Sequence, residues 1–166
     1  MVSTKEGRFV SNMKQDQLKL AVMERHRQTG HIGLGIVKGF QISDGAMAST
    51  VAHDSHNIVT VGTNDEDMLL AVRTLEQMQG GLVVVKNGKI AASLALQISG
   101  LMASMPTEKV LQSLQELHHA LDLIGSQNTF NPFVALSFLS LPVIPALKLT
   151  TSGLFDVSRF EHISIQ

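Results

Sequence analysis

The chain of 166 residues contains no cysteine, no tryptophan and no tyrosine. Without cysteine it has no disulfide bonds, no thiolate nucleophile and no metal site with cysteine ligands. Seven phenylalanines are the only Phe, Trp or Tyr side chains, so a surface on which nucleic-acid bases stack is not expected. Thiol chemistry is therefore excluded, as are the cysteine-ligated classes of metalloprotein.

Charge is also scarce. Charged residues make up 16% of the chain, and 13 basic against 14 acidic residues give a formal net charge of −1. The basic surface that binds nucleic acid is therefore missing. The hydrophobic fraction of 44% excludes intrinsic disorder. Such an apolar chain indicates either a dense core or an extended interface, and we expect a homo-oligomer.

No targeting or membrane segment is evident. Residues 1–16 lack the apolar run of a secretory signal. Two long stretches without charge, 90–107 and 123–147, are interrupted by polar residues, glycine or proline, which argues against a membrane-spanning helix. We therefore expect a cytoplasmic protein without a membrane partner.

Hydrophobic periodicity and turn signals predict an α+β domain. Asn64 and three acidic residues begin a helix over about 65–79, and Pro106 begins a second helix over about 107–123. The Asn87-Gly88 pair between apolar runs predicts a hairpin. Further strands are expected at 18–24 and 32–40, in two short segments within 50–63, and in a closing segment at 155–165 after a polar turn at 150–153. The prediction is a mainly antiparallel sheet or sheets with two principal helices packed on them, and no (β/α)8 barrel. Residues 1–17 are an N-terminal extension or the start of the domain, and residues 18–166 form a single domain.

The densest polar cluster lies between two apolar segments and consists of His53, Asp54, Ser55, His56 and Asn57. Two imidazoles beside a carboxylate, a hydroxyl and an amide are able to bind a metal ion or to transfer protons near pH 7. On a continuous strand the two histidines would point to opposite faces, so they converge only if the segment turns. The alternative is a polar corner whose Asp and Asn side chains bond to backbone groups.

Other motifs are weaker. The segment 24–26, Glu-Arg-His, either positions an anion or a base or is a solvated strand end. The glycines at 30, 33, 35 and 39 lack the spacing of a dinucleotide-binding loop, and no amphipathic helix follows them. They favour bulges or the close approach of a neighbouring backbone or a ligand. His118 and His119 fall on the second helix and are interpreted as structural or solvated.

Taken together, these motifs resemble the C-terminal domain of bacterial adenine deaminases. The matching blocks follow the order of that family over nearly the whole chain: 24–26, 33–35 with 37–40, 52–57, 61–68, 80–85, 136–145 and 153–157. The resemblance implies a hydrolase that converts adenine and water to hypoxanthine and ammonia in purine salvage. It also implies an amidohydrolase (β/α)8 barrel that holds a divalent metal ion (iron, manganese or zinc) and activates water.

The sequence departs from a complete enzyme of that kind. A (β/α)8 barrel needs about 200 residues or more, and the chain lacks the early His-x-His pair of such barrels. We therefore expect a C-terminal domain that has no activity alone, requires no cofactor of its own and completes or covers the active site of a barrel on the same or a separate chain.

The resemblance favours a functional role for the polar corner at 53–57. His53, Asp54 and His56 are the candidate catalytic contributors; either histidine would contact the metal or carry a proton to the departing ammonia, and Asp54 would orient an imidazole. Glu24, His26, Ser55 and Asn57 are the candidate substrate-binding residues. Two alternatives remain open: a non-catalytic module for structure or oligomerisation, and an independent metal- or ligand-binding domain.

Overall fold

Six antiparallel strands form the central sheet, in the order β4-β3-β6-β5-β7-β8. The computed structural model describes residues 4–5 and 8–164. The elements are β1 (Thr4–Lys5), β2 (Arg8–Phe9), the 3-10 helix η1 (Met13–Gln15), β3 (Leu18–Met23), β4 (Ile32–Val37), β5 (Ala46–Ser49), β6 (Ile58–Gly62), α1 (Asp65–Gln77), β7 (Gly81–Lys86), β8 (Lys89–Ala95), α2 (Thr107–Leu123), α3 (Pro132–Phe138), β9 (Leu147–Thr150), β10 (Gly153–Asp156) and β11 (Glu161–His162).

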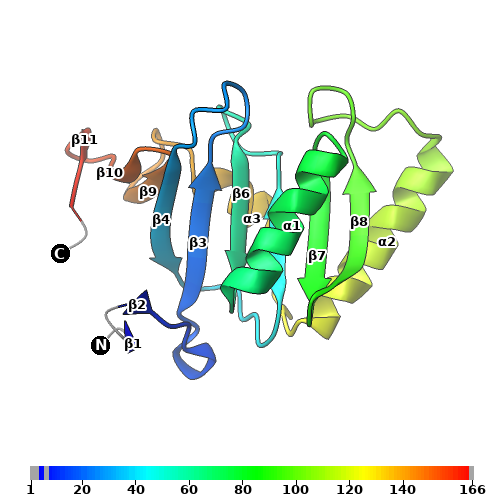
Figure 1. Cartoon of the computed structure of the whole chain (residues 1–166), viewed down its shortest axis with the longest axis horizontal. Coiled ribbons are helices and arrows are strands. Elements are labelled where there is room, and N and C mark those ends of the chain that lie inside the picture. The colour runs from blue at the N-terminus through cyan, green and yellow to red at the C-terminus, as the bar shows by residue number, and fades with distance from the viewer. Residues whose placement is uncertain (1–3, 6–7, 165–166) are drawn as a thin grey trace.

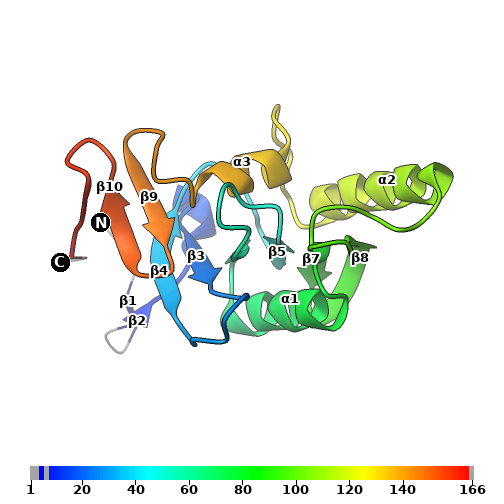
Figure 2. The ribbon, with the colours of Figure 1, turned by 90° about the horizontal axis from the view of Figure 1, so that it is seen from above.

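The elements stack in three layers. Helix α1 covers one face of the sheet, while α2, α3 and the three-stranded sheet β11-β10-β9 cover the other (Figures 1 and 2). The larger core lies on the second side and includes the fully buried Met47, Leu117 and Leu136. A smaller core under α1 contains Leu75 and Val83. The sheet of the described residues is open, with β4 and β8 at its edges, so the α+β prediction without a barrel is confirmed.

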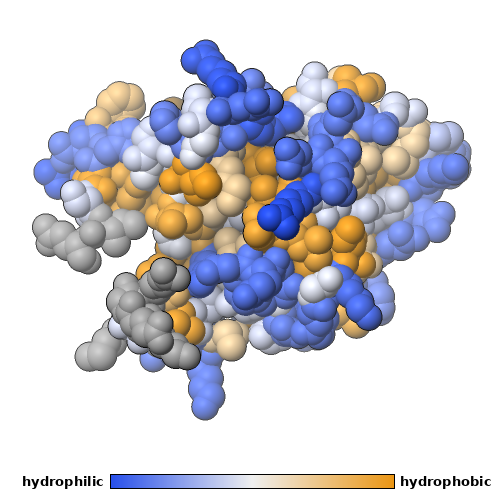
Figure 3. Space-filling model, viewed as in Figure 1, coloured by the Kyte–Doolittle hydropathy of each residue, from blue (hydrophilic) through white to orange (hydrophobic). Residues whose placement is uncertain are grey.

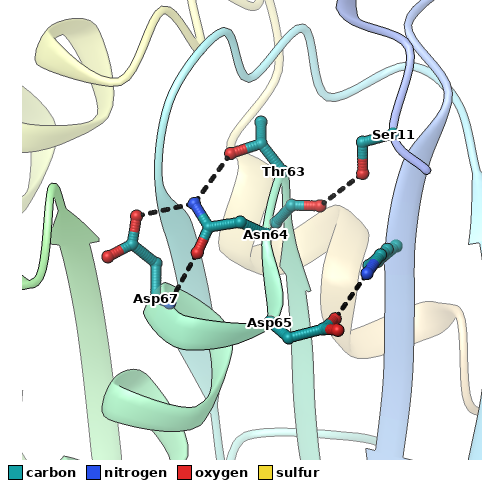
Figure 4. Close-up of polar contacts among 7 residues, drawn as sticks. Ser11, Thr63, Asn64, Asp65 and Asp67 are labelled. Atoms are coloured by element: carbon teal, nitrogen blue, oxygen red, sulfur yellow. Dashed lines mark hydrogen bonds and ion pairs between the residues drawn. The ribbon is translucent and has the colours of Figure 1, made fainter.

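Local signals explain both long helices. Asn64 caps α1: its side-chain oxygen accepts a hydrogen bond from the Asp67 N–H (2.8 Å), and its side-chain amide donates to the Asp67 carboxylate (2.9 Å; Figure 4). The same carboxylate accepts the Gly88 N–H (2.7 Å) and so ties the start of α1 to the hairpin turn. Helix α2 has the predicted bounds. In the hairpin, Asn87 and Gly88 have φ values of 51° and 69°, as a type I′ turn requires.

The glycines of β4 allow two sheets to approach each other. A Cβ atom on Gly33 would lie 1.9 Å from the Thr150 carbonyl oxygen, and one on Gly35 would lie 3.3 Å from the Leu149 side chain. The predicted close approach by a neighbouring backbone is therefore confirmed at Gly33. Strand β4 ends at Val37 rather than near Phe40, because Gly39 takes a left-handed backbone (φ 106°).

One prediction of local structure was wrong, and one helix was not predicted. The first strand beside the polar corner, β5, ends at Ser49, so the range 50–63 holds one strand rather than two. The segment 132–138 forms a third helix, α3, whose start is capped by the Asn131 side chain. Its seven residues are too few for a periodic pattern to indicate a helix.

The outward face of β4 is apolar and uncovered. Ile32, Leu34 and Ile36 are 51%, 65% and 42% exposed, because α1 packs on the middle of the sheet and does not extend over β4 (Figures 1 and 3). Among the helices described, none combines the length and hydrophobicity needed to cross a bilayer.

Candidate functional site: the polar corner at one edge of the sheet

All seven candidate residues lie at the edge of the sheet where β3 and β5 end and where β4 and β6 begin. They are on the loop between β3 and β4 and on the loop between β5 and β6. The two loops are joined directly: the His26 Nε2 atom lies 2.7 Å from the Ser55 carbonyl oxygen, within hydrogen-bond distance. A hollow of about 460 Å³ between them is lined by all four candidate substrate-binding residues, Glu24, His26, Ser55 and Asn57. The fold thus brings together residues that the sequence separates by about thirty positions.

The chain turns at the corner, and the two histidines converge. Residues 53–55 form a turn that is closed by a hydrogen bond from the His56 N–H to the Ala52 carbonyl (2.7 Å). The ring centroids of His53 and His56 are 6.1 Å apart, with the planes inclined by 62°. His56 takes a left-handed backbone (φ 49°), a conformation that is uncommon for residues other than glycine and is enriched at functional sites.

Helix α3 fixes the first of these rings. The imidazole of His53 stacks on the Phe138 ring, with centroids 5.1 Å apart and planes inclined by 30°. The backbone N–H of His53 donates to the Ser137 carbonyl at 3.2 Å. Because α3 was not predicted, neither contact was foreseen.

The side chain of Arg25 binds the backbone of the second histidine, His56. Its Nε donates to the His56 carbonyl and its Nη2 to the Ser99 carbonyl, both at 2.6 Å. The guanidinium also fills the space beside Gly100, where a Cβ atom would meet it at 2.6 Å. Burial lowers the pKa of Arg25. Arg25 therefore connects three loops at this edge; it belongs to the 24–26 motif, but nothing in that motif predicted its partners.

Glu24 shapes its own loop. Its carboxylate accepts the N–H groups of His26 (2.5 Å), Arg27 (2.8 Å) and Thr29 (3.2 Å), and also the Thr29 hydroxyl (3.3 Å). Desolvation acts to raise the pKa of Glu24, but the hydrogen bonds from Thr29, Arg27 and His26 outweigh it and lower that pKa to about 2. The ionised carboxylate thus holds the wall of the hollow in place.

The corner is not an internally satisfied turn. His56 Nδ1 and Asn57 Oδ1 are buried and have no hydrogen-bond partner among the described residues. Within the same part of the chain, the Asp54 carboxylate, which is exposed, forms no hydrogen bond to a backbone group. This differs from the alternative in which Asp and Asn side chains satisfy the backbone, and it leaves these groups free to meet a ligand or a second body.

The corner does not form a metal site by itself. A structural zinc site uses four protein ligands and a catalytic one uses three. Residues 4–5 and 8–164 contain no group of three or more His, Asp or Glu side chains able to hold a metal ion. The pair His53 and His56 therefore does not form a complete set of metal ligands by itself within these residues.

Electrostatics keep one imidazole neutral. Desolvation lowers the pKa of His56 below its ordinary value of 6.5. The positive charges of His53 and Arg25 lower it further, and the Asp54 carboxylate acts in the opposite direction. At neutral pH His56 is therefore an uncharged base with a free lone pair, next to a second imidazole.

This pKa shift makes the stability of the chain depend on pH. As the pH falls below 6.5, His56 takes up a proton in the unfolded chain before it does so in the folded chain, and the free energy of unfolding decreases. We expect His56→Asn, which tolerates the left-handed backbone, to weaken this decrease in urea unfolding measured across that range. His118→Asn, on the exposed side of α2, is the control and should leave it unchanged. Equal pH dependence of the parent and His56→Asn would contradict the shift.

Sequence comparisons place these residues in a known context. The family model described as "Adenine deaminase C-terminal domain" matches residues 1–161. The adenine deaminase of Halalkalibacterium halodurans is 52% identical over 165 residues, which are 99% of this chain and 28% of the relative. That of Bacillus subtilis is 53% identical over 158 residues, which are 95% of this chain and 27% of the relative. The chain thus spans little more than a quarter of the length of the curated relatives that it matches.

Proposed function

Because the chain belongs to the family of adenine deaminase C-terminal domains, we propose that it serves as the accessory domain of an adenine deaminase. That hydrolase converts adenine and water to hypoxanthine and ammonia. The catalytic barrel, the divalent metal and most of the adenine site would be supplied by the remaining part of the enzyme. A metal ion is assigned to that part because the described residues offer no set of three ligands.

In this proposal the polar corner closes the active site. The observation that carries it is the convergence of His53 with a neutral His56 at an exposed sheet edge, beside buried polar atoms without partners. Replacing the amino group of adenine by oxygen requires a proton to travel from the attacking water to the departing ammonia. A neutral His56 is able to accept such a proton, His53 lies near enough to exchange it through one water molecule, and the Asp54 charge stabilises the imidazolium.

The apolar face of β4 supports a second body at this edge. Ile32 follows the 24–31 loop directly, so the exposed face of Ile32, Leu34 and Ile36 adjoins the polar corner. Covering these side chains would remove apolar surface from water, which favours association. We assign this face to contact with the barrel. The alternative is that this face contacts a second copy of the chain, which would make the domain an oligomerisation module. Sedimentation of the chain in solution distinguishes a monomer from such an oligomer.

A chimeric enzyme tests the catalytic role. This chain replaces the matching segment of the Bacillus subtilis adenine deaminase, and ammonia release is measured for the parent chimera and for His53→Asn and His56→Asn. We expect each variant to lower kcat by about a hundredfold, the usual contribution of a general acid or base, with little change in KM.

His118→Asn in the same chimera is the matched control and should retain the parent kcat. Thermal unfolding of each variant separates a lost proton carrier from a misfolded domain. An unchanged kcat in both His53→Asn and His56→Asn, at the stability of the parent, would contradict the proposed role of the histidines and favour a purely structural domain.

A further inference from the structure

A second hollow lies behind the polar corner, on the side of the sheet that carries α3 and β9. It has a volume of about 410 Å³ and is formed by the corner, by residues 140–143 after α3 and by the turn between β9 and β10. This volume is within the range of small-molecule sites in proteins. Of the residues assigned above to proton transfer, Asp54 lines this hollow, whereas His53 and His56 do not.

Two polar side chains of this hollow are buried without compensation. Asn57 is 8% exposed and Ser140 is 5% exposed, and both line the hollow. Neither Asn57 Oδ1 nor Ser140 Oγ has a hydrogen-bond partner among the described residues, and both atoms are almost fully shielded from solvent. A buried acceptor that lacks a donor costs stability, so a ligand that brings a donor recovers that cost.

Charge and hydrophobicity narrow the class of ligand. Asp54 is the only charged residue among those that line the hollow, so the local field favours a hydrogen-bond donor or a cation over an anion. The apolar wall of the hollow consists of Val22, Leu141, Pro142 and Val143. A bare ammonium ion would leave this wall in contact with water, whereas a flat ring would cover it.

We infer that this hollow binds an amino-substituted heteroaromatic base, whose N–H groups donate to Asn57 and Ser140 while its ring packs on the apolar wall. Adenine is such a base, and purine is the same ring system without the amino group. The inference stands on the hollow itself and does not require that the corner histidines transfer protons.

Titration of the ¹⁵N-labelled 166-residue chain tests it. Adenine should shift the backbone amide signals around the hollow, at Val22, Leu141 and Val143. Purine should bind about tenfold more weakly, because it has only its ring N–H and lacks the amino group, so it cannot supply a donor to both buried oxygens. Equal affinity for the two bases, no binding of adenine, or shifts confined to another part of the chain would each overturn the inference.

Two variants assign the contacts. Asn57→Leu and Ser140→Ala should each weaken adenine binding about tenfold, while Ser113→Ala, a hydroxyl-to-methyl change on α2, should leave it unchanged. Asn57→Leu should fold at least as well as the parent, because it removes a buried oxygen without a partner. Parental adenine affinity in both hollow variants would refute the assignment; should Asn57→Leu fail to fold, Ser140→Ala and the purine comparison still decide it. No turnover is measured, so failure here leaves the chimera result standing, and the reverse holds as well.

Discussion

Gly33→Ala is expected to lower the free energy of unfolding by about 3 kcal/mol or more, the upper end of the cost of overpacking a well-packed interior. The added Cβ atom would lie 1.9 Å from the Thr150 carbonyl oxygen and 3.0 Å from its carbonyl carbon. These are backbone atoms of β9 that cannot rotate away. The variant must push the β9–β10 sheet off β4, and urea unfolding followed by circular dichroism measures the loss.

Gly35→Ala is the matched control for this prediction. It lies two residues along the same strand and faces the same sheet, but its Cβ would meet the flexible Leu149 side chain at 3.3 Å. A small rearrangement of Leu149 relieves that contact, so the loss should stay below about 1 kcal/mol. Equal losses in the two variants would show that glycine at β4 matters for some reason other than the approach of Thr150.

Asp67→Ala is expected to cost about 4 kcal/mol. Asp67 is 3% exposed, and its two carboxylate oxygens accept hydrogen bonds from the Gly88 N–H and from the Asn64 side chain. Hydrogen bonds to a charged group contribute about 1.5–3 kcal/mol each, and their removal leaves buried donors unpaired. The variant keeps the backbone N–H that Asn64 caps, but it loses the contact between the Asn64 side-chain amide and the carboxylate (Figure 4). It also loses the link from α1 to the β7–β8 turn, and urea unfolding would register both losses.

Asp65→Ala separates this network from a general effect of charge at the helix start. Asp65 lies in the same first turn of α1, but its side chain is 78% exposed and pairs with Lys19. Exposed ion pairs contribute little, so Asp65→Ala should remain close to the parent. A comparable loss in both variants would mean that the helix dipole, rather than the buried hydrogen bonds, accounts for the effect of Asp67.

Features that depend on neighbouring residues in the chain were predictable from the sequence. Pro106 and the apolar stripe define α2, Asn64 defines the start of α1, and Asn87-Gly88 defines the hairpin turn. In each case the physical signal is contained within a few residues, as backbone conformation and caps require. The clustering of polar groups at 53–57 was visible for the same reason.

Features that depend on tertiary contacts were not predictable. The stacking of His53 on Phe138 requires α3, and the role of Arg25 requires the Ser99 carbonyl to lie opposite its guanidinium. The unpartnered state of Asn57 Oδ1 is a property of everything packed around it. A single sequence shows which residue types are present but not which of their hydrogen-bonding groups remain without a partner after folding.

The two hydrogen bonds of the Arg25 guanidinium matter when segments are exchanged between related proteins. One guanidinium joins the carbonyl of His56 to that of Ser99, and the absence of a side chain at Gly100 makes room for it. The backbone position of His56 is therefore set partly by a segment that contains no candidate catalytic group. Transfer of residues 53–57 to another protein would therefore require Arg25 and residues 99–100 to be transferred together with them.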